Sequence, residues 1–580
     1  MENNKKKLHA LKKSMLQQWE IYPLLFLVCL YPLIMRLEFV PIDLSQYSWF
    51  PDTSTQVDVF LFWKSRVLVV LASIMLFFIM SHRLANRKSK RLPNYFMFLL
   101  GYIVLVIIST ICSNYRSYSI FGGIEQYESV WVLIGYVIIA VTTYYFMGSN
   151  VRQQVFLVAL CIGAGILVII GLSQLFDSDL MKTDILKYLY IPNDLVQYWN
   201  KLNFNFSGGS SDSVYMTLYN PNYVGSYVVL VLPVIIGVFT GVRKAYVKRM
   251  LGGLIVGLVL CLYGSGSKAA AIVLFLIGVF TIYLIYEKRK MIKIMLCGLI
   301  AMVLCSGILL FYMIRTDTSV LNKLEAIHTT TDAVVIQYNK ESIKVRYEEN
   351  ELKFYKDKQS ECMITEKRDG VIRLVDPLYE NIYGVFGQNK EYFTLIINGK
   401  KWSFAIPTYT FINDYGKEDQ LVDSKSVLDQ KLDELFSSRG YIWGRIIPTI
   451  NKYAFIGSGP DTFLMEFSQS DYVAKWKAGY GSELITKPHS MYLQMAVQTG
   501  ILSVVCFLGF CYSYVRRVIK GYKGHIVWTW NHRIEFGIFL GVVGYLIIGI
   551  VNDSTNTIAP IFWCFIGFGW NMRDRIEKDS

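Results

Sequence analysis

The sequence predicts an all-α polytopic membrane protein of about twelve transmembrane helices with an inserted extracytoplasmic β-rich domain. Of its 580 residues, 53% are hydrophobic and only 18% are charged, whereas ordinary globular proteins carry about 25% charged residues. Apolar runs close to the length that crosses a hydrocarbon core of ~30 Å recur along the chain. One long segment between two such runs instead alternates polar and apolar residues, as strands do. These features exclude a soluble globular enzyme and a single-pass receptor.

The apolar runs also predict the orientation. With a cytoplasmic N-terminus, most Lys and Arg residues outside the largest loop fall on the inner side, as the positive-inside rule requires. The net charge of +14 therefore reflects topology rather than nucleic-acid binding. We expect a multi-pass protein of the cytoplasmic cell membrane, with both termini cytoplasmic, that contacts membrane lipids and no nucleic acid. The predicted spans lie at about 22–41, 60–80, 94–112, 129–148, 155–175, 223–241, 251–264, 269–286, 294–314, 490–515, 535–551 and 558–572.

These spans divide the chain into predicted domains. Nine spans precede a loop that is far too long to be a passive connector, and three spans follow it. The domains are a basic cytoplasmic N-terminus (1–21), the first part of the membrane core (22–314), a large extracytoplasmic loop (315–488), the last three spans (489–572) and a cytoplasmic tail (573–580).

The large loop has two predicted parts. Residues 331–412 alternate in strand fashion, and Asn398-Gly399 between two apolar runs is a hairpin signal. Residues 424–488 are predicted to be helical, beginning with an amphipathic helix over Ser426–Phe436. No catalytic pattern is visible in the β-rich part, so we interpret it as an accessory module.

Neither a cofactor nor a metal is expected. Nine of the ten cysteines lie in or at the ends of predicted spans, and Cys362 alone sits well outside them. The sequence contains no CxxC or HExxH motif and no clustered His and Asp residues of metal-ligand spacing. Buried cysteines in spans are best interpreted as small hydrophobic residues.

Six short motifs punctuate the predicted extracytoplasmic side. Two of them lie upstream of the large loop, at the start of the sixth span and in a tight hairpin between the seventh and eighth spans. The motifs are Asn220-Pro221-Asn222, Gly264-Ser265-Gly266-Ser267-Lys268, Arg439-x-x-x-Trp443, Gly457-Ser458-Gly459-Pro460, His489 followed by Tyr492-Leu493-Gln494, and Thr499-Gly500.

In this order and spacing, the chain resembles the O-antigen ligase / O-antigen polymerase superfamily of bacterial polytopic membrane glycosyltransferases. The resemblance covers about residues 100–572, except the β-rich part. It implies a metal-independent glycosyltransferase that moves an oligosaccharide or polysaccharide from undecaprenyl diphosphate to an acceptor hydroxyl, for cell-surface polysaccharide assembly. The acceptor would be a glycan, a lipid or a protein, and the reaction would take place on the outer face of the membrane.

Such a transfer needs a base for the hydroxyl proton and cations for the departing diphosphate. His489 is the best candidate base, because histidine titrates near neutral pH, although it could also be an interfacial residue that merely starts a span. Arg439 and Trp443, four residues apart, share a helix face. Arg445, six residues after Arg439, would point about 120° away on the same helix and could equally be a solvated surface charge. Asp553 is an alternative base.

Further substrate-binding candidates lie upstream. Lys268 stands where the family usually has an arginine, which keeps the charge and loses the bidentate fork. Lys64 and Arg66 lie near the outer end of the second span, where charges usually face a cavity or a partner. Asn220 and Asn222 could bind sugar hydroxyls, although the same residues could cap the sixth span.

Three alternatives remain open from the sequence. A polymerase of the same superfamily would join two lipid-linked repeats, and no residue separates it from a ligase. A flippase or transporter of lipid-linked sugars should place charges at mid-membrane and show related halves, and neither feature is visible. A structural or sensory protein would bind wall polymer through its β-rich part and have an inactive core.

Overall fold

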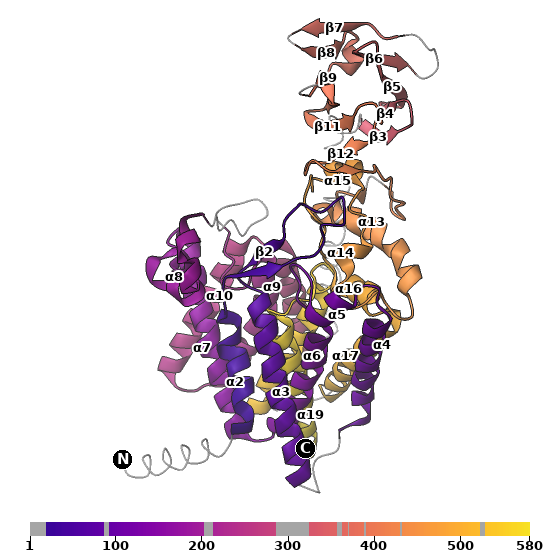
Figure 1. Ribbon diagram of the computed structural model, residues 1–580. Helices are drawn as coiled ribbons and strands as arrows, with labels where there is room; N and C mark the ends of the chain where they lie inside the picture. Colours follow the sequence, from indigo (N-terminus) through magenta and orange to yellow (C-terminus); the bar gives the residue numbers. More distant parts are fainter. Residues whose placement is uncertain are drawn as a thin grey trace.

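The computed structural model combines a helical bundle with a β-rich domain that projects from one end of it (Figure 1). We call this end of the bundle the site end. The last helix finishes at the opposite end, where the C-terminus is marked. The structure describes residues 19–85, 92–201, 213–285, 324–356, 362–368, 370–387, 390–429, 432–522 and 528–579.

Seven helical segments among the described residues are long and apolar enough to cross a membrane, and three shorter apolar segments, Trp19–Cys29, Val130–Phe146 and Lys268–Thr281, accompany them. The protein is therefore a multi-pass membrane protein. The seven are α3 (Phe62–Ala85), α4 (Met97–Cys112) with the short turn before it, α7 (Asn150–Leu175), α9 (Pro221–Gly241), α10 (Ala245–Ser265), α17 (Ile501–Gly521) and α18 (Trp530–Ile548). The other bundle helices are α2 (Tyr22–Cys29), α6 (Val130–Phe146), α11 (Lys268–Ile285) and α19 (Ala559–Asp579), with short helices α5 (Arg116–Phe121) and α8 (Asp184–Tyr190) at their margins.

The predicted number of twelve spans is not reached among the described residues, and the span predicted at 294–314 lies outside them. The first predicted span, 22–41, is wrong in its second half: helix α2 ends at Cys29, and residues 38–41 form strand β1 (Glu38–Pro41), which pairs with β2 (Thr55–Asp58). This two-stranded ribbon satisfies backbone groups that a helix would otherwise pair internally.

The tenth predicted span, 490–515, is also divided. A short helix, α16 (Met491–Gln498), is followed by a break at Gly500 and then by α17. Gly500 has φ +88°, and an added Cβ would lie 2.8 Å from the carbonyl oxygen of Phe455. Only glycine fits this conformation and this close approach, so the apolar pattern continues while the helix does not.

Small residues allow the bundle helices to approach closely. An added Cβ on Gly541 of α18 would lie 2.3 Å from the carbonyl oxygen of Leu230 on α9, and one on Gly567 of α19 would lie 2.2 Å from that of Ala140 on α6. Close backbone approach through small residues is a common way to pack helices in membranes, where apolar association between helices has little driving force.

The β-rich domain contains two antiparallel sheets that share one apolar core, which includes Phe354, Phe393 and Trp402. The predicted hairpin is confirmed, since β10 and β11 are joined by Asn398 (φ +50°) and Gly399 (φ +80°). One sheet has the order β3 (Leu324–Thr329), β4 (Val334–Tyr338), β5 (Glu341–Glu348), β6 (Glu351–Lys356). The other runs β13 (Glu418–Asp419), β12 (Phe411–Ile412), β11 (Lys400–Ala405), β10 (Tyr392–Ile397), β9 (Ile382–Phe386), β8 (Val371–Leu374), β7 (Thr365–Arg368).

Three helices connect this domain to α16: α13 (Leu435–Tyr453), α14 (Phe463–Glu466) and α15 (Tyr472–Lys477). Of the amphipathic helix predicted at Ser426–Phe436, the described residues 426–429 are not helical, and residues 430 and 431 lie outside the described part. The amide of Val427 donates to the carbonyl oxygen of Gly444 on α13 at 2.9 Å, so this part of the segment lies against α13. Three residues with positive φ follow Leu435, and regular α13 begins at Arg439.

Candidate functional site

The candidate site lies at the site end, where three segments meet: the residues just before α16, the first turns of α13, and the loop between α18 and α19. The amide of Met491 donates to the carbonyl oxygens of Gly549 at 2.9 Å and Asn552 at 2.8 Å. The Trp443 indole Nε1 donates to the carbonyl oxygen of Pro488 at 2.9 Å. These bonds hold chain segments together that are up to about a hundred residues apart in sequence.

His489 and Asp553 form a pair at the centre of this junction. The His489 Nδ1 lies 2.9 Å from the Asp553 Oδ2, and the histidine side chain is 32% exposed whereas that of Asp553 is 2% exposed. Burial acts to raise the pKa of Asp553, but His489, Lys487 and Arg439 outweigh it and hold the pKa below 3.8. The carboxylate therefore stays ionised and engages Nδ1, which leaves Nε2 as the ring nitrogen for proton transfer.

The backbone at His489 has φ +52°, a left-handed conformation that is uncommon for residues other than glycine. Such conformations cost of order 1–3 kcal/mol and persist where the surrounding structure imposes them. The hydrogen bonds of Pro488 and Met491 on either side of His489 supply that constraint. The ring is consequently held in one orientation toward Asp553.

Arg439 is the nearest guanidinium to this pair. Its Nη2 donates to the Asn552 Oδ1 at 3.4 Å, beside Asp553 in the same loop. Burial lowers the pKa of Arg439, while Asp553 acts in the opposite direction; the group remains a cation. Among the described residues, no carboxylate lies within salt-bridge distance of it. Arg439 thus contacts the loop of Asp553, whereas Trp443, one turn later on α13, contacts the segment that carries His489.

Lys487 is a second cation that sequence reasoning missed. Its side chain is only 7% exposed, and its Nζ makes no hydrogen bond to the described residues. The nearest carboxylate oxygen, from Glu125, is 3.7 Å away, and Nζ lies 5.0 Å from the ring centroid of Tyr219 and 5.8 Å from that of Tyr223. Burial acts to lower the pKa of Lys487, but Tyr219, Glu125 and Asp553 raise it above its ordinary value. The ammonium is therefore charged, buried and only loosely paired.

Arg445 is placed differently from the prediction. Its Nε donates to Asp471 at 2.6 Å, and its Nη1 donates to Asp433 at 3.0 Å and to the carbonyl oxygen of Tyr441 at 3.3 Å. The guanidinium is buried between two carboxylates. Because these partners occupy its donors, Arg445 is a structural ion-pair residue and is not retained as a diphosphate ligand.

The two predicted asparagines lie at the start of α9. The Asn220 Oδ1 accepts from the amide of Asn222 at 2.8 Å, so Asn220 is the N-cap of α9. The Asn552 Nδ2 donates to the Asn222 carbonyl oxygen at 3.4 Å and to the Ser226 hydroxyl at 2.9 Å. Asn222 therefore adjoins the loop of Asp553, and Asn220 shapes the helix that carries it.

The hairpin between α10 and α11 packs on the same part of α9. An added Cβ on Gly225 would lie 2.4 Å from the Ser267 hydroxyl oxygen. Lys268, the next residue, is exposed at the first position of α11. Lys268 thus lies beside the α9 turn that contacts Asn552, with its ammonium directed to the surface.

Lys64 and Arg66 lie on α3. The Lys64 Nζ is fully buried and donates to the carbonyl oxygen of Thr217 at 2.6 Å. The Arg66 guanidinium stacks 4.7 Å from the Phe62 ring centroid. Lys64 thus fixes the segment that leads to Tyr219, which in turn contacts Lys487, and its ammonium is already engaged by protein.

The glycine-containing motif after α13 has a positioning role. The Asp461 Oδ2 accepts from the amides of Gly123 at 2.5 Å and Glu128 at 3.0 Å. An added Cβ on Gly459 would lie 2.4 Å from the Ser113 hydroxyl oxygen. The motif therefore fixes residues 123–128 beside α16. Those residues include Glu125 and Glu128, which sequence reasoning did not single out although charges next to an apolar span are a recognised signal.

Among the residues that the structure describes, no three His, Cys, Asp or Glu side chains come together as a metal ion would require. No curated protein and no solved structure matches the chain. A family model described as O-antigen ligase matches residues 253–508, an interval that contains Arg439, Lys487 and His489 and ends before Asp553. This match identifies an O-antigen ligase domain, from a glycosyltransferase-like family, within residues 253–508 of this multi-pass membrane protein.

Proposed function

We propose that the protein transfers a glycan from undecaprenyl diphosphate to an acceptor hydroxyl on a glycan, a lipid or a protein. The observation that carries the proposal is the His489–Asp553 pair, with an Nδ1 to Oδ2 distance of 2.9 Å, beside two loosely paired cations, Arg439 and Lys487. A base and nearby cations with donors to spare are what a displacement with an anionic leaving group needs.

In the proposed reaction the acceptor oxygen attacks the anomeric carbon of the glycan. His489 Nε2 takes the hydroxyl proton as the new oxygen–carbon bond forms. The bond from the anomeric carbon to the diphosphate oxygen breaks, and its electron pair leaves with undecaprenyl diphosphate. Asp553 stabilises the imidazolium that results, because it stays ionised and bonds to Nδ1. The single displacement inverts the anomeric configuration.

Arg439 and Lys487 are the proposed ligands of the diphosphate. The poor hydrogen bond of Arg439, at 3.4 Å, and the Nζ of Lys487, which makes no hydrogen bond to the described residues, leave donors for phosphate oxygens, and guanidinium groups suit such oxygens well. Trp443 and Asn222 border the same junction and are proposed to contact the glycan. Lys268 and Arg66 remain more distant candidates.

The proposed reaction takes place on the outer face of the cytoplasmic membrane, for surface polysaccharide assembly. Helices α13 and α16, which carry or adjoin the residues of the candidate site, lie at one end of the bundle, where the head group of a lipid-linked donor would lie (Figure 1). This arrangement favours transfer at a membrane surface over a flippase, which needs a path of polar groups through the membrane. Ligase and polymerase differ only in the acceptor.

The test uses the full-length protein in nanodiscs with a radiolabelled undecaprenyl-diphosphate oligosaccharide and its candidate acceptors. We expect His489→Ala to lower the rate of transfer and of undecaprenyl diphosphate release by about 10²- to 10⁴-fold, the usual worth of a positioned general base. His328→Ala, in strand β3 of the β-rich domain, is the matched control and should retain the wild-type rate. Equal rates for wild type and His489→Ala would contradict the proposal.

A further inference from the structure

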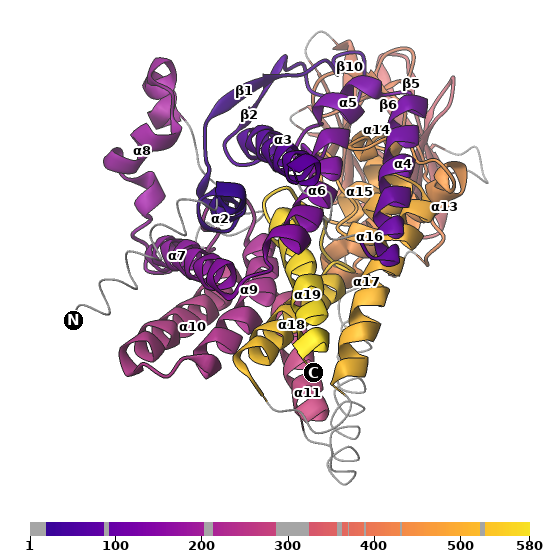
Figure 2. The same cartoon turned by 90° about the horizontal axis from the view of Figure 1, so that it is seen from below.

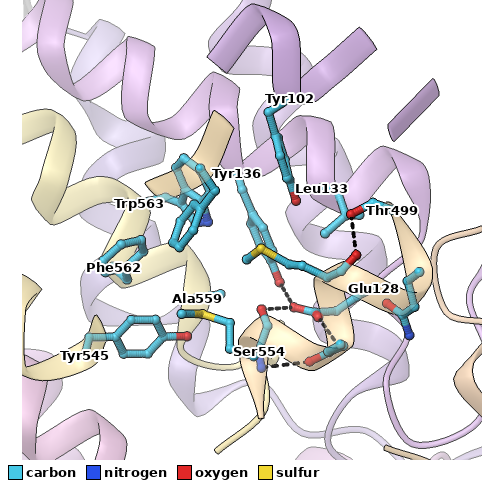
Figure 3. A pocket seen from close by; sticks show the side chains of 15 residues that line it. Tyr102, Glu128, Leu133, Tyr136, Thr499, Tyr545, Ser554, Ala559, Phe562 and Trp563 are labelled. Carbon is cyan, nitrogen blue, oxygen red and sulfur yellow. Dashed lines mark hydrogen bonds between the residues drawn. The ribbon is translucent and has the colours of Figure 1, made fainter. Parts of the chain in front are cut away.

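Glu128 is a buried carboxyl group that directly supports the loop of Asp553. Only 2% of Glu128 is exposed. Its Oε1 accepts from the Tyr136 hydroxyl at 2.5 Å and from the Ser554 hydroxyl at 2.9 Å, and its Oε2 accepts from the Gln494 Nε2 at 3.0 Å (Figure 3). The amide of Ser554 also donates to the Gln494 Oε1 at 2.9 Å.

These partners connect Glu128 to both members of the proposed catalytic pair. Ser554 follows Asp553 directly in the chain, and Gln494 lies on α16, the helix that begins just after His489. The carboxyl group thus bridges two segments whose separation sets the distance between Asp553 and His489.

Glu128 is itself held in place by the same end of the bundle. Its backbone amide donates to Asp461 at 3.0 Å. Two residues earlier, the Gln126 Oε1 accepts from Gln494 at 3.1 Å and from Gln498 at 3.0 Å. A side chain fixed at this many points can transmit a constraint to the groups it binds.

Aromatic side chains make up much of the rest of its surroundings. Glu128 lies on the wall of a cavity whose other lining includes Tyr102, Phe562 and Trp563 (Figure 3). In these surroundings Tyr136, Ser554 and Gln494 donate the hydrogen bonds that a buried carboxyl group requires.

We propose that Glu128 is a positioning residue of the transfer reaction, which fixes Asp553 against His489 through Ser554 and Gln494. This inference rests on the proposed function for its effect on rate. Its structural effect, the orientation of the His489 ring, is independent of the substrate.

Burial also raises the pKa of Glu128 to about 7, and the charge of Asp553 acts in the same direction. The titratable groups that face it are the phenols of Tyr136, Tyr102, Tyr545 and Tyr223 from α6, α4, α18 and α9, that of Tyr31 from the turn after α2, and the carboxyls of Asp553 and Asp461. Above this pH the carboxylate accepts all three of its hydrogen bonds. Below it, the added proton makes the carboxyl group a donor and weakens it as an acceptor, so its hold on these three partners changes.

The experiment compares Glu128→Gln and Glu128→Ala in the transfer assay. Gln keeps the size and loses the titration, so we expect a reduced kcat, an unchanged KM and a pH profile with one ionisation fewer than wild type. Ala removes the bridge, and we expect kcat to fall on the order of 10- to 100-fold, the effect of a small displacement of catalytic groups. Wild-type kcat and pH profile in both variants would overturn the inference.

A matched control is available at the opposite end of the bundle. Glu535 on α18 is also fully buried, and it accepts from the Tyr522 hydroxyl at 2.8 Å. We expect Glu535→Gln to keep the wild-type pH profile. If it loses the same ionisation as Glu128→Gln, the effect is a general one of buried carboxyl groups, and the inference is overturned.

A second readout separates this inference from the proposed function. The chain has six histidines, so the ¹⁵N resonances of His489 can be assigned in labelled protein by comparison with His489→Ala. We expect Glu128→Gln to shift these resonances, and Glu535→Gln to leave them in place. A shift without any transfer by the wild-type protein would contradict the proposed function and support positioning. Unchanged resonances would overturn positioning whatever the activity.

Discussion

Arg439 and Arg445 stand six residues apart on α13, in opposite electrostatic surroundings. Arg445 is buried and bonded to Asp471 at 2.6 Å and Asp433 at 3.0 Å. Arg439 has one long hydrogen bond, to Asn552 at 3.4 Å, and lies in the field of Asp553. Arg445 therefore belongs to a closed ion-pair cluster with Asp433 and Asp471. Arg439, on the same helix, belongs to an open cluster with Lys487, His489 and Asp553.

This difference distinguishes charged residues that stabilise the fold from charged residues that are available to bind a substrate. In the closed cluster every cation has its counter-ions, and removing one member leaves an uncompensated buried charge. In the open cluster the cations are only loosely paired. Lys487 reaches the Glu125 carboxylate at 3.7 Å, and Arg439 lies in the field of Asp553, which is bonded to His489. An anion with several phosphate oxygens would give both cations closer partners.

The largest effect is expected from Asp553→Asn. Asparagine keeps the size and removes the charge that stabilises the imidazolium form of His489, so transfer should fall by about 10²- to 10⁴-fold. The measurement is the initial rate with radiolabelled undecaprenyl-diphosphate oligosaccharide. Asp376→Asn, on the surface of the β-rich domain, is the control. A small loss in Asp553→Asn would mean that His489 acts without its partner.

Arg445→Ala should act on stability instead. It leaves Asp433 and Asp471 buried without their cation, at a cost of about 3–5 kcal/mol. We expect lower yield and a lower midpoint of thermal unfolding, together with a near-normal rate per folded molecule. A protein that is stable but inactive would place Arg445 in the open cluster and remove the contrast.

Arg439 should show the reverse pattern. We expect Arg439→Ala to lower transfer by about 10²-fold, the loss typical of one charge-stabilising donor, with little change in thermal unfolding. Arg439→Lys keeps the charge without the planar fork and should lie between Ala and wild type. Measured affinity for undecaprenyl diphosphate should follow the same order. An unaltered affinity in Arg439→Ala would assign the diphosphate to other cations.

The smallest effect expected is a difference in the pH dependence of stability. Burial raises the pKa of Asp471 to about 6, so its contribution to stability is full below about 3.8 and is lost as pH rises through about 6. The pKa of Asp553 is lowered, so its contribution is present above 3.8 and is lost as the pH falls below that value. Replacing each by Asn should change the slope of the free energy of unfolding against pH with opposite sign, by about 1 kcal/mol per pH unit.

Much of the fold could be predicted from local pattern. Long apolar runs identified helices such as α7 and α9, and alternation identified the strands on either side of Asn398-Gly399. Breaks inside an apolar run were not predicted. Gly500, for example, ends a helix because it lies close to Phe455, which is distant in sequence. A one-dimensional pattern carries no information on such contacts.

The candidate site was predictable residue by residue but not as an arrangement. His489 and Asp553 were both considered as bases, yet their pairing depends on a loop 64 residues away. Arg445 carried the same signal as Arg439, and only the carboxylates of Asp433 and Asp471 distinguish them. Lys487 lies only two residues before His489, but its burial is a tertiary property that a sequence pattern does not show.

The ion pair between Arg445 and Asp471 also connects the β-rich domain to α13. Tyr472, the next residue, packs in the core of the β-rich domain, with its ring centroid 4.9 Å from that of Phe411 and its hydroxyl donating to Asp419 at 2.6 Å. A movement of the β-rich domain would therefore be transmitted to Asp471, and through Arg445 to α13, the helix that carries Arg439. The salt bridge thus connects the β-rich domain to the candidate site.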